Sequence, residues 1–379
     1  MTGPTDASPT PDRSCLASAR TVVVKVGTAA LTGGTEELDR AFVHDLAAEL
    51  AGLRASGRRV VLVSSGAVGA GIGPLGLERT PSDVTELQAA AAVGQPLLMS
   101  LWREALAVRG LPVAQVLVGR TDFDTRDRYL NIRNCLACLH ERSVLPIVNE
   151  NDTVATEEIS LGDNDILAGK LAASVRADAL VILTTVDGVL GPDGVVVSDA
   201  PDADGLLRLV RSEKSAQGRG GMRTKVEAAR LAGLSGVPTV IASGGPTGTL
   251  TRVLASEPVG TFVPPAPARH AGRRVWIALT STPAGMIQVD AGAARALVER
   301  GASLLARGVL NVTGRFGAGD VVAIHDDHGK EIARGLTNLT SDELRAVRGE
   351  PSSNFERLLG RRTHEEVVHR DNLAVTAAG

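Results

Sequence analysis

The stretch TVVVKV, residues 21–26, followed by Gly27 and Thr28, decides how this chain folds. Valine-rich runs favour strands, and a run of apolar residues without alternation is typical of a strand buried on both faces of a sheet. We therefore expect a sheet that is covered on both sides. Comparable apolar runs recur along the chain at residues 59–63, 113–118, 145–148, 179–184 and 238–242.

Segments with apolar residues at helical spacing lie between these runs, at residues 39–54, 85–109, 126–141, 166–177 and 224–232. Strands that alternate with amphipathic helices favour a mostly parallel sheet sandwiched by helices. We expect an α/β domain over residues 20–262. In such folds, ligands gather outside the carboxyl ends of the strands.

A proline-rich stretch without periodicity, residues 263–272, is the expected linker to a second domain. We expect a small, mainly β domain over residues 273–373, then a tail at 374–379. Its expected elements are a helix at 291–299 and short strands at 275–279, 285–289, 321–325 and 332–336.

Composition sets the broad class of the protein. The chain has 379 residues, 44% hydrophobic and 22% charged, which is enough for two domains with cores of their own. No apolar run approaches the roughly 18 residues that a membrane span needs. Residues 1–19 lack the basic start and hydrophobic stretch of a signal peptide, so we expect a disordered leader and a cytoplasmic protein. A net charge of −3 gives no general attraction to nucleic acid or membrane.

The three cysteines are Cys15, Cys135 and Cys138, an odd number that argues against a disulfide framework. Cys135, Cys138 and His140 raise the alternative of a metal site. No second Cys/His pair follows them, and they fall in a segment with helical apolar spacing. We therefore expect no dedicated metal site.

Two lysines stand in stretches suited to holding phosphate. Lys25 comes near the end of the first strand, just before Gly27, where a point charge can meet a phosphate and glycine lets the backbone approach. Lys225 closes the run GRGGMRTK, residues 218–225, which is not a Walker A loop because Gly-Lys-[Ser/Thr] is missing. We expect its glycines to form a mobile flap over phosphates.

Small residues follow the strand 59–63 in the run SSGAVGAG, residues 64–71, and permit a ligand carboxylate or phosphate to approach backbone N–H groups. The overlapping run 71–76 matches the dinucleotide fingerprint G-x-G-x-x-G. We discount this match because it lies beyond the strand end, contains Pro74 and stands alone.

Two clusters of carboxylates and amides, NEND at 149–152 and GDND at 162–165, follow the strand 145–148. They suit the ammonium and carboxylate of an amino acid, or the placement of lysines and Mg²⁺. Turn and cap chemistry is the alternative, with Asn164 or Asp165 capping the helix that starts near Ile166. Two such clusters in one domain favour a functional role.

Taken together, these stretches resemble the amino acid kinase family and, within it, the glutamate 5-kinases. In the C-terminal part, GASLL at 301–305 and VTGRF at 312–316 are similar to the PUA domain that many of these kinases carry. The matching stretches of the kinase part are VVVKVGT (22–28), VVLVSSGAVGAG (60–71), AAVGQ (91–95), RYLN (128–131), PIVNENDTVAT (146–156), GDNDILA (162–168) and GGMRTK (220–225).

The resemblance implies ATP-dependent phosphorylation of the side-chain carboxylate of L-glutamate, the first step of proline synthesis. It implies that Ser65, Asp152 and Asn164 bind glutamate. It further implies a homo-oligomer inhibited by proline. The residues that it places at ATP are Lys25, Thr184, Thr185, Arg219, Gly220, Gly221, Met222, Arg223, Thr224 and Lys225.

The chemistry of this reaction fits the residue types. A glutamate carboxylate is ionised at neutral pH, so no general base is required. The obstacle is repulsion between that anion and the γ-phosphoryl group. We expect Lys25 and Lys225 to flank the transferring group, with Asp163 and Asp165 orienting the lysines or holding Mg²⁺.

Some residues depart from the family pattern on the nucleotide side. Thr185 stands where the family has aspartate, Leu190 where it has an aromatic residue, and GPDG at 191–194 shortens the following loop. The alternatives are another kinase that forms an acylphosphate, on aspartate or acetylglutamate, or an RNA-binding PUA protein. Residues 273–358 carry 11 Lys and Arg against 10 Asp and Glu, which argues against RNA binding.

Overall fold

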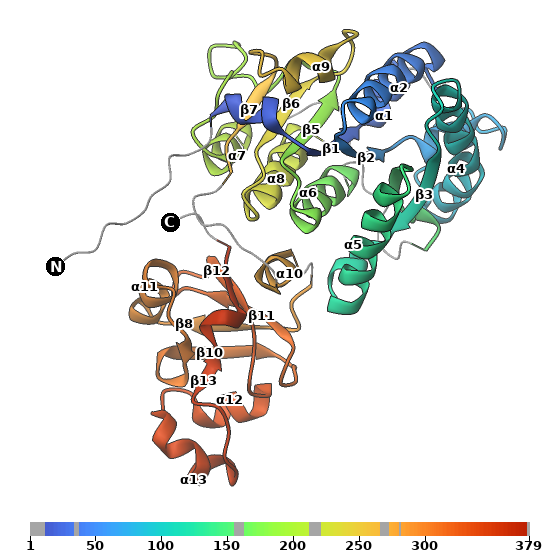
Figure 1. The fold of residues 1–379 in the computed structure, drawn as a ribbon. Coiled ribbons are helices and arrows are strands. Elements are labelled where there is room, and N and C mark those ends of the chain that lie inside the picture. Colours follow the sequence, from blue (N-terminus) through green and yellow to red (C-terminus); the bar gives the residue numbers. More distant parts are fainter. Residues whose placement is uncertain are drawn as a thin grey trace. The chain divides into compact units, whose positions relative to one another are not determined.

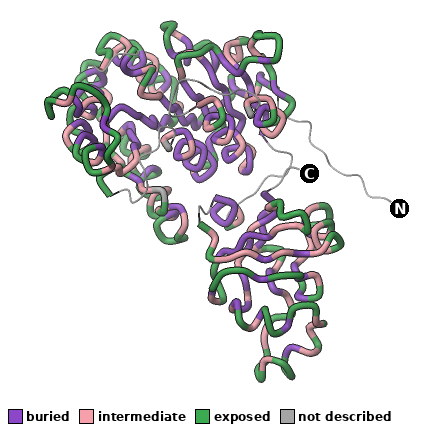
Figure 2. The backbone as a smooth tube through the Cα atoms, turned by 180° about the vertical axis from the view of Figure 1, so that it is seen from behind, coloured by how far each residue is buried: buried purple, intermediate pink, exposed green. Residues whose placement is uncertain are grey.

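The computed structural model describes residues 12–33, 38–154, 163–211, 221–265, 273–279 and 282–376. The chain divides into two compact units, residues 1–120 with 130–267 and residues 121–129 with 268–379 (Figure 1). Each unit has its own sheet and its own hydrophobic core. In Figure 2 the strands at the centre of the first unit run as continuous buried segments. Within the described residues, no helix combines the length and apolar character of a membrane span.

The first unit is built on a seven-stranded sheet in the order β3-β4-β2-β1-β5-β6-β7. Neighbouring strands pair in parallel except β6 and β7, which are antiparallel. The predicted mostly parallel α/β sheet is thus confirmed. The strands are β1 (Thr21–Val26), β2 (Arg59–Ser64), β3 (Val113–Val118), β4 (Leu145–Glu150), β5 (Ala179–Thr184), β6 (Thr239–Ser243) and β7 (Thr261–Val263).

Helices cover both faces of this sheet. Val22, Val24 and Val26 of β1 join one core with α2 (Arg40–Ala55), α4 (Val84–Ala107) and α9 (Thr249–Leu254). Successive side chains of a strand point to opposite faces. Val23 and Lys25 therefore face the helices that pack on the other side, α6 (Asp163–Val175) and α8 (Met222–Gly233). The other helices described before residue 260 are η1 (Arg13–Ser18), α1 (Thr28–Leu31), α3 (Ala67–Ile72), η2 (Arg120–Phe123), α5 (Arg126–Glu141), η3 (Asp152–Val154) and α7 (Ala203–Arg211).

The predicted elements of this unit agree with the structure to within three residues at each end, and β1, β3, β5 and α5 match at both ends. The start of α6 differs in a way that bears on function. We expected Asn164 or Asp165 to cap a helix that begins near Ile166, but α6 begins at Asp163. Both residues lie inside the first helical turn, so the cap interpretation is wrong and their side chains project from the helix.

The expectation of a disordered leader over residues 1–19 is wrong for its second half. Residues 13–18 form η1, and Leu16 and Ala19 are buried in the core of the first unit. Two of the polar residues that suggested disorder instead begin this helix: the Asp12 side chain caps η1 by accepting a hydrogen bond from the Ser14 amide. Residues 1–11 lie outside the described part of the chain.

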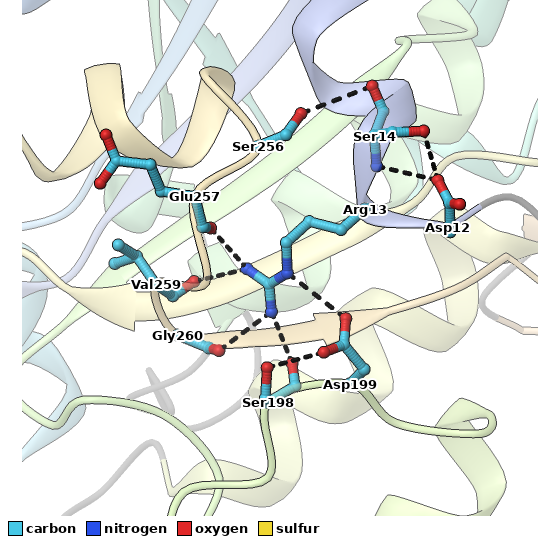
Figure 3. Close-up of polar contacts among 9 residues, drawn as sticks. All are labelled: Asp12, Arg13, Ser14, Ser198, Asp199, Ser256, Glu257, Val259 and Gly260. Carbon is cyan, nitrogen blue, oxygen red and sulfur yellow. Dashed lines mark hydrogen bonds and ion pairs between the residues drawn. The ribbon is translucent and has the colours of Figure 1, made fainter.

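Arg13 holds this segment in place (Figure 3). Its guanidinium donates hydrogen bonds to the backbone carbonyls of Ser198, Glu257, Val259 and Gly260, at 2.6–3.2 Å, and pairs with Asp199 at 3.3 Å. It also lies 5.7 Å from the centre of the Phe262 ring. An arginine offers five N–H donors in a rigid fork, which suits a site where several carbonyls converge. The start of the described chain is thereby tied to residues near 200 and 260.

The second unit has a five-stranded sheet in the order β10-β8-β11-β12-β14 and a two-stranded sheet of β13 and β9. Its core contains Ile287, Val289, Val322 and Ile324, together with Leu344 of α12. The small, mainly β domain is thus confirmed. Its strands are β8 (Gly285–Val289), β9 (Leu304–Leu305), β10 (Val309–Gly314), β11 (Val321–His325), β12 (Glu331–Leu336), β13 (Glu366–Val368) and β14 (Leu373–Val375). Its helices are α10 (Arg273–Leu279), α11 (Ala291–Arg300), η4 (Ala306–Gly308), α12 (Ser341–Val347), η5 (Ser352–Asn354), α13 (Phe355–Leu359) and η6 (Arg370–Asn372).

Two predictions about this part of the chain are wrong, and a third falls mostly outside the described residues. The strand expected at 275–279 is helix α10, whose residues Val275–Leu279 are all buried; a short apolar run does not distinguish a buried strand from a buried helix. The expected tail from residue 374 is part of β14, where Ala374 and Val375 pair with β12. The expected linker, 263–272, starts inside β7, and its residues 266–272 lie outside the described chain.

Candidate active site

Two buried lysines and one buried carboxylate meet at the carboxyl end of β1. The Lys25 ammonium lies 2.5 Å from Oδ1 of Asp165, and the Lys225 ammonium lies 3.1 Å from its Oδ2. The Thr224 hydroxyl donates to the same Oδ2 at 2.7 Å. Lys25, Asp165 and Lys225 are 4%, 0% and 8% exposed. One carboxylate thus holds two cations that are far apart in sequence on the same side of the sheet.

Close contact between α6 and α8 allows this meeting. Gly169 stands one turn after Asp165, and a Cβ at that position would lie only 2.4 Å from the backbone oxygen of Ala228, one turn after Lys225. Glycine is therefore required there for the helix backbones to touch. The contact brings the first turns of the two helices together, so that Asp165 reaches both Thr224 and Lys225.

Burial and charge act against each other in this cluster. Burial lowers the pKa of Lys25 from its usual value; Asp165 opposes that shift and the Lys225 ammonium adds to it. Burial by itself would raise the pKa of Asp165, but the two lysines and the Thr224 hydroxyl outweigh it and leave that pKa below its usual value. Asp165 is therefore ionised at neutral pH. An ion pair enclosed in this way interacts much more strongly than one in water.

A second group of polar side chains lies at the ends of β2 and β4. The Asn164 amide donates through Nδ2 to the Ser65 hydroxyl at 3.1 Å and to Oδ1 of Asn149 at 2.9 Å. Oδ1 of Asn164 is buried and accepts no hydrogen bond from any described residue. Ser65 is placed by its own amide, which donates to the Val26 carbonyl at the end of β1. Because Asn164 and Asp165 are adjacent on α6, this group borders the lysine cluster.

For the other predicted site residues, the structure gives only their position in an element, or they lie outside the described residues. Asp152 begins η3 directly after β4. Asp163 is the first residue of α6, and only its backbone is described. Arg219 and Gly220 lie outside the described residues, whereas Gly221 is the N-cap of α8 and precedes Met222 and Arg223 in its first turn.

Thr184, the last residue of β5, and Thr185 line a cavity of about 380 Å³ between α2, β5 and α9. Three carboxylates also line it, those of Asp39, Asp45 and Glu49. The Glu49 carboxylate accepts hydrogen bonds from the backbone amides of Gly248 and Thr251. Such an acidic lining repels phosphates, whereas the positive charges of the lysine cluster, on the other face of the sheet, attract them.

Within the described residues, no group of three His, Cys, Asp or Glu side chains lies close enough together to hold a metal ion. Cys135 and Cys138 are exposed free thiols on α5. The carboxylate best placed to meet a cation, that of Asp165, already faces two lysines.

A sequence model of the amino acid kinase family matches residues 20–243, more than half of the chain. This chain belongs to the amino acid kinase family. A model of the PUA domain matches residues 285–359 of the same kinase. A glutamate 5-kinase of Thermus thermophilus is 44% identical over 364 residues, which cover 94% of this chain and 98% of that protein. The glutamate 5-kinase of Moorella thermoacetica is 45% identical over 373 residues, 96% and 98% of the two chains.

The resemblance of this kinase to the glutamate 5-kinases with a PUA domain is thus confirmed along almost the whole chain. Two further residues connect to Asn164: Asn149 accepts from it directly, and Gln95 accepts from Asn149. Asn149 was predicted only as part of the NEND cluster, and no role was predicted for Gln95. Both fall in the matching stretches AAVGQ and NEND. In the sequence, the only indication of their role was an amide side chain within each matching stretch. The hydrogen bond between the stretches AAVGQ and NEND is visible only in the fold.

Proposed function

We propose that this kinase transfers the γ-phosphoryl group of ATP to the side-chain carboxylate of L-glutamate, giving L-glutamyl 5-phosphate and ADP in the first step of proline synthesis. The observation that carries the proposal is the Lys25–Asp165–Lys225 cluster beside the Ser65–Asn164 pair, at the carboxyl edge of one sheet. Matches to glutamate 5-kinases over 94% and 96% of the chain support the choice of glutamate.

The two lysines address the main barrier to the reaction. The acceptor carboxylate and the γ-phosphoryl group are both anions, and charge spreads over the equatorial oxygens of the phosphoryl group in the transition state. Lys25 and Lys225 offer two positive charges whose positions Asp165 already fixes. Charges placed before the reaction need little reorganisation during it, which is the main source of electrostatic catalysis.

Asp165 is assigned to positioning the lysines, and not to removing a proton. The acceptor carboxylate needs no base, and both oxygens of Asp165 face ammonium groups. A lysine ammonium has three N–H donors, so its contact with one carboxylate oxygen leaves donors on Lys25 for phosphate oxygens. Lys225 sits in the first turn of α8, where the helix N-terminus also favours phosphate.

Mg²⁺ is the proposed partner of ATP. The described residues offer no cage of carboxylates for it, which fits a cation held mainly by phosphate oxygens and water. Since Asp165 faces the lysines, we assign contact with the cation to Asp163 of the same GDND motif. When bound, Mg²⁺ neutralises charge on the β- and γ-phosphates.

Glutamate would bind between Ser65, Asn164 and Asp152. Asp152 suits the α-ammonium group by charge, and the buried Oδ1 of Asn164 is an acceptor that a substrate N–H donor can use. We also propose a cytoplasmic homo-oligomer that proline inhibits, since proline shares the α-carboxylate and an ammonium with glutamate. RNA binding to the PUA domain is disfavoured by its balanced charge of 11 basic and 10 acidic residues over 273–358.

The direct test of substrate choice is ADP release by the full chain with ATP, Mg²⁺ and, in turn, L-glutamate, L-aspartate and N-acetyl-L-glutamate. Hydroxylamine in the assay traps an acylphosphate as a hydroxamate. We expect ADP release and hydroxamate with glutamate at a rate at least a hundredfold above the other two. Equal or faster release with aspartate or N-acetylglutamate would refute the proposed substrate, and added proline checks inhibition in the same assay.

A further inference from the structure

Four amide side chains form a hydrogen-bonded relay that ends at the buried oxygen of Asn164. Asn164 donates through Nδ2 to Oδ1 of Asn149 at 2.9 Å, and Asn149 donates through Nδ2 to Oε1 of Gln95 at 2.8 Å. Gln95 then donates through Nε2 to Oε1 of Gln115 at 3.1 Å. Gln115 lies exposed on β3, at the edge of the sheet. Within the relay each amide donates to the next one, from Asn164 toward Gln115, while the Asn164 amide donates in addition to the Ser65 hydroxyl.

A backbone group fixes that direction. The N–H of Glu150 can only donate, and it donates to Oδ1 of Asn149 at 2.9 Å. The Nδ2 of Asn149 must therefore face Gln95, which has to present its oxygen. Asn164 must in turn meet Oδ1 of Asn149 with its own Nδ2. The polarity of one backbone amide thus determines that Asn164 keeps its oxygen, and not its NH₂ group, for the substrate.

Gln95 reaches Asn149 because α3 and α4 touch. A Cβ on Gly94 would lie 1.8 Å from the carbonyl oxygen of Ala67, so the glycine beside Gln95 lets the two helix backbones meet. Gln95 is 9% exposed and Asn149 is 1% exposed. A buried amide hydrogen without an acceptor is costly, so Asn149 depends on the oxygen of Gln95 to keep its orientation.

We propose that Gln95 is a positioning residue that selects substrates with an α-ammonium group, by holding Asn149 and Asn164 so that Oδ1 of Asn164 accepts from that ammonium. The inference rests on the proposed function, since it concerns the substrate of the same site. Gln95 itself touches no substrate in this account. Its effect reaches the substrate through two hydrogen bonds, from Asn149 to Gln95 and from Asn164 to Asn149, at 2.8 and 2.9 Å.

The test compares Gln95→Met with Gln95→Glu in the full chain. Methionine keeps the length and apolar packing of glutamine but accepts no strong hydrogen bond, whereas glutamate keeps the acceptor for Asn149. Gln288→Met is the matched control, since it makes the same exchange on β8 of the second unit, where the Gln288 amide donates to the Asp327 carbonyl. The readouts are KM for L-glutamate, KM for ATP, and the inhibition constant of glutarate, which has both carboxylates of glutamate but no ammonium.

We expect Gln95→Met to raise KM for glutamate at least tenfold, while KM for ATP and the inhibition constant of glutarate change less than threefold. Gln95→Glu and Gln288→Met should stay within threefold of the wild type for glutamate. These constants do not depend on the fraction of folded enzyme, so a loss of stability alone cannot imitate the result. Equal weakening of glutamate and glutarate, or equal KM values for Gln95→Met and Gln95→Glu, would overturn the inference. If the wild type shows no glutamate-dependent ADP release, the proposed function itself fails.

Discussion

At the scale of single residues, Asp165 is the side chain on which the lysine cluster depends. Its two oxygens hold the Lys25 and Lys225 ammonium groups, and all three residues are buried. Removing one partner of a buried ion pair leaves the others without compensation, at a cost of about 3–5 kcal/mol. The sequence predicted this residue and both lysines. It left open whether the Asp165 carboxylate orients the lysines or holds Mg²⁺, and the fold favours the first role.

Replacing Asp165 with asparagine should therefore lower both stability and activity. The pKa of Asp165 lies below its usual value in the folded chain, so the carboxylate stabilises the fold above pH of about 4. That stabilisation is lost as the pH falls through the folded-state pKa. Thermal unfolding of the wild type and Asp165→Asn from pH 3 to 8 should show a difference in Tm that is large at pH 6–8 and shrinks toward pH 3. A difference that is constant over this range would contradict an ionised, lysine-paired Asp165.

At the scale of elements, the site depends on how closely helices approach each other, which the sequence pattern does not report. Apolar runs and helical spacing were sufficient to predict the six parallel strands and five main helices of the first unit. Gly169 carried no such signal, although it sets the contact between α6 and α8. The relay through Gln95 was hidden for the same reason, because it joins residues 54 positions apart. Helix α12 did have a local signal, the capping box of Thr340 and Glu343, that was overlooked.

Gly169→Ala tests whether the helix contact holds the site together. The new Cβ would lie 2.4 Å from a backbone oxygen, so α6 and α8 must move apart. We expect a loss of about 1–3 kcal/mol in stability and a fall in kcat of at least tenfold, because Asp165 and Lys225 separate. Gly52→Ala is the control: this helical glycine has nothing within 4 Å of its Cβ position, and the change should be neutral or stabilising. Urea unfolding and steady-state kinetics supply both numbers, and normal kcat in Gly169→Ala would disprove the dependence.

At the scale of the whole molecule, the described chain is two units with separate cores, and its N-terminal segment is part of the first. Composition suggested a leader over residues 1–19 because Pro, Asp, Ser and Thr predominate there. A single arginine overrides that composition, since Arg13 joins η1 to segments near 200 and 260 (Figure 3). Local composition cannot reveal such a contact, which spans about 185 and 246 residues of sequence.

Arg13→Ala should destabilise the first unit by about 2–4 kcal/mol, because four backbone carbonyls lose a donor and a buried space opens. Arg40→Ala is the matched control, since Arg40 pairs with Glu104 on the surface, where both side chains are more than half exposed. That change should stay within about 0.5 kcal/mol. Denaturant unfolding of both variants measures the difference, and an Arg13→Ala variant as stable as Arg40→Ala would show that the segment is dispensable.

We propose that Lys25 and Lys225, held by Asp165, neutralise two anions as a phosphoryl group passes to glutamate. The measurement that tests it most directly is kcat for glutamate-dependent ADP release by Lys225→Ala, beside the exposed control Lys330→Ala. We predict a fall of at least a hundredfold for Lys225→Ala, or roughly 3 kcal/mol in the barrier, by analogy with the loss of one donor to a developing anion. Lys330→Ala should match the wild type. A Lys225→Ala enzyme with near-normal kcat would contradict the account.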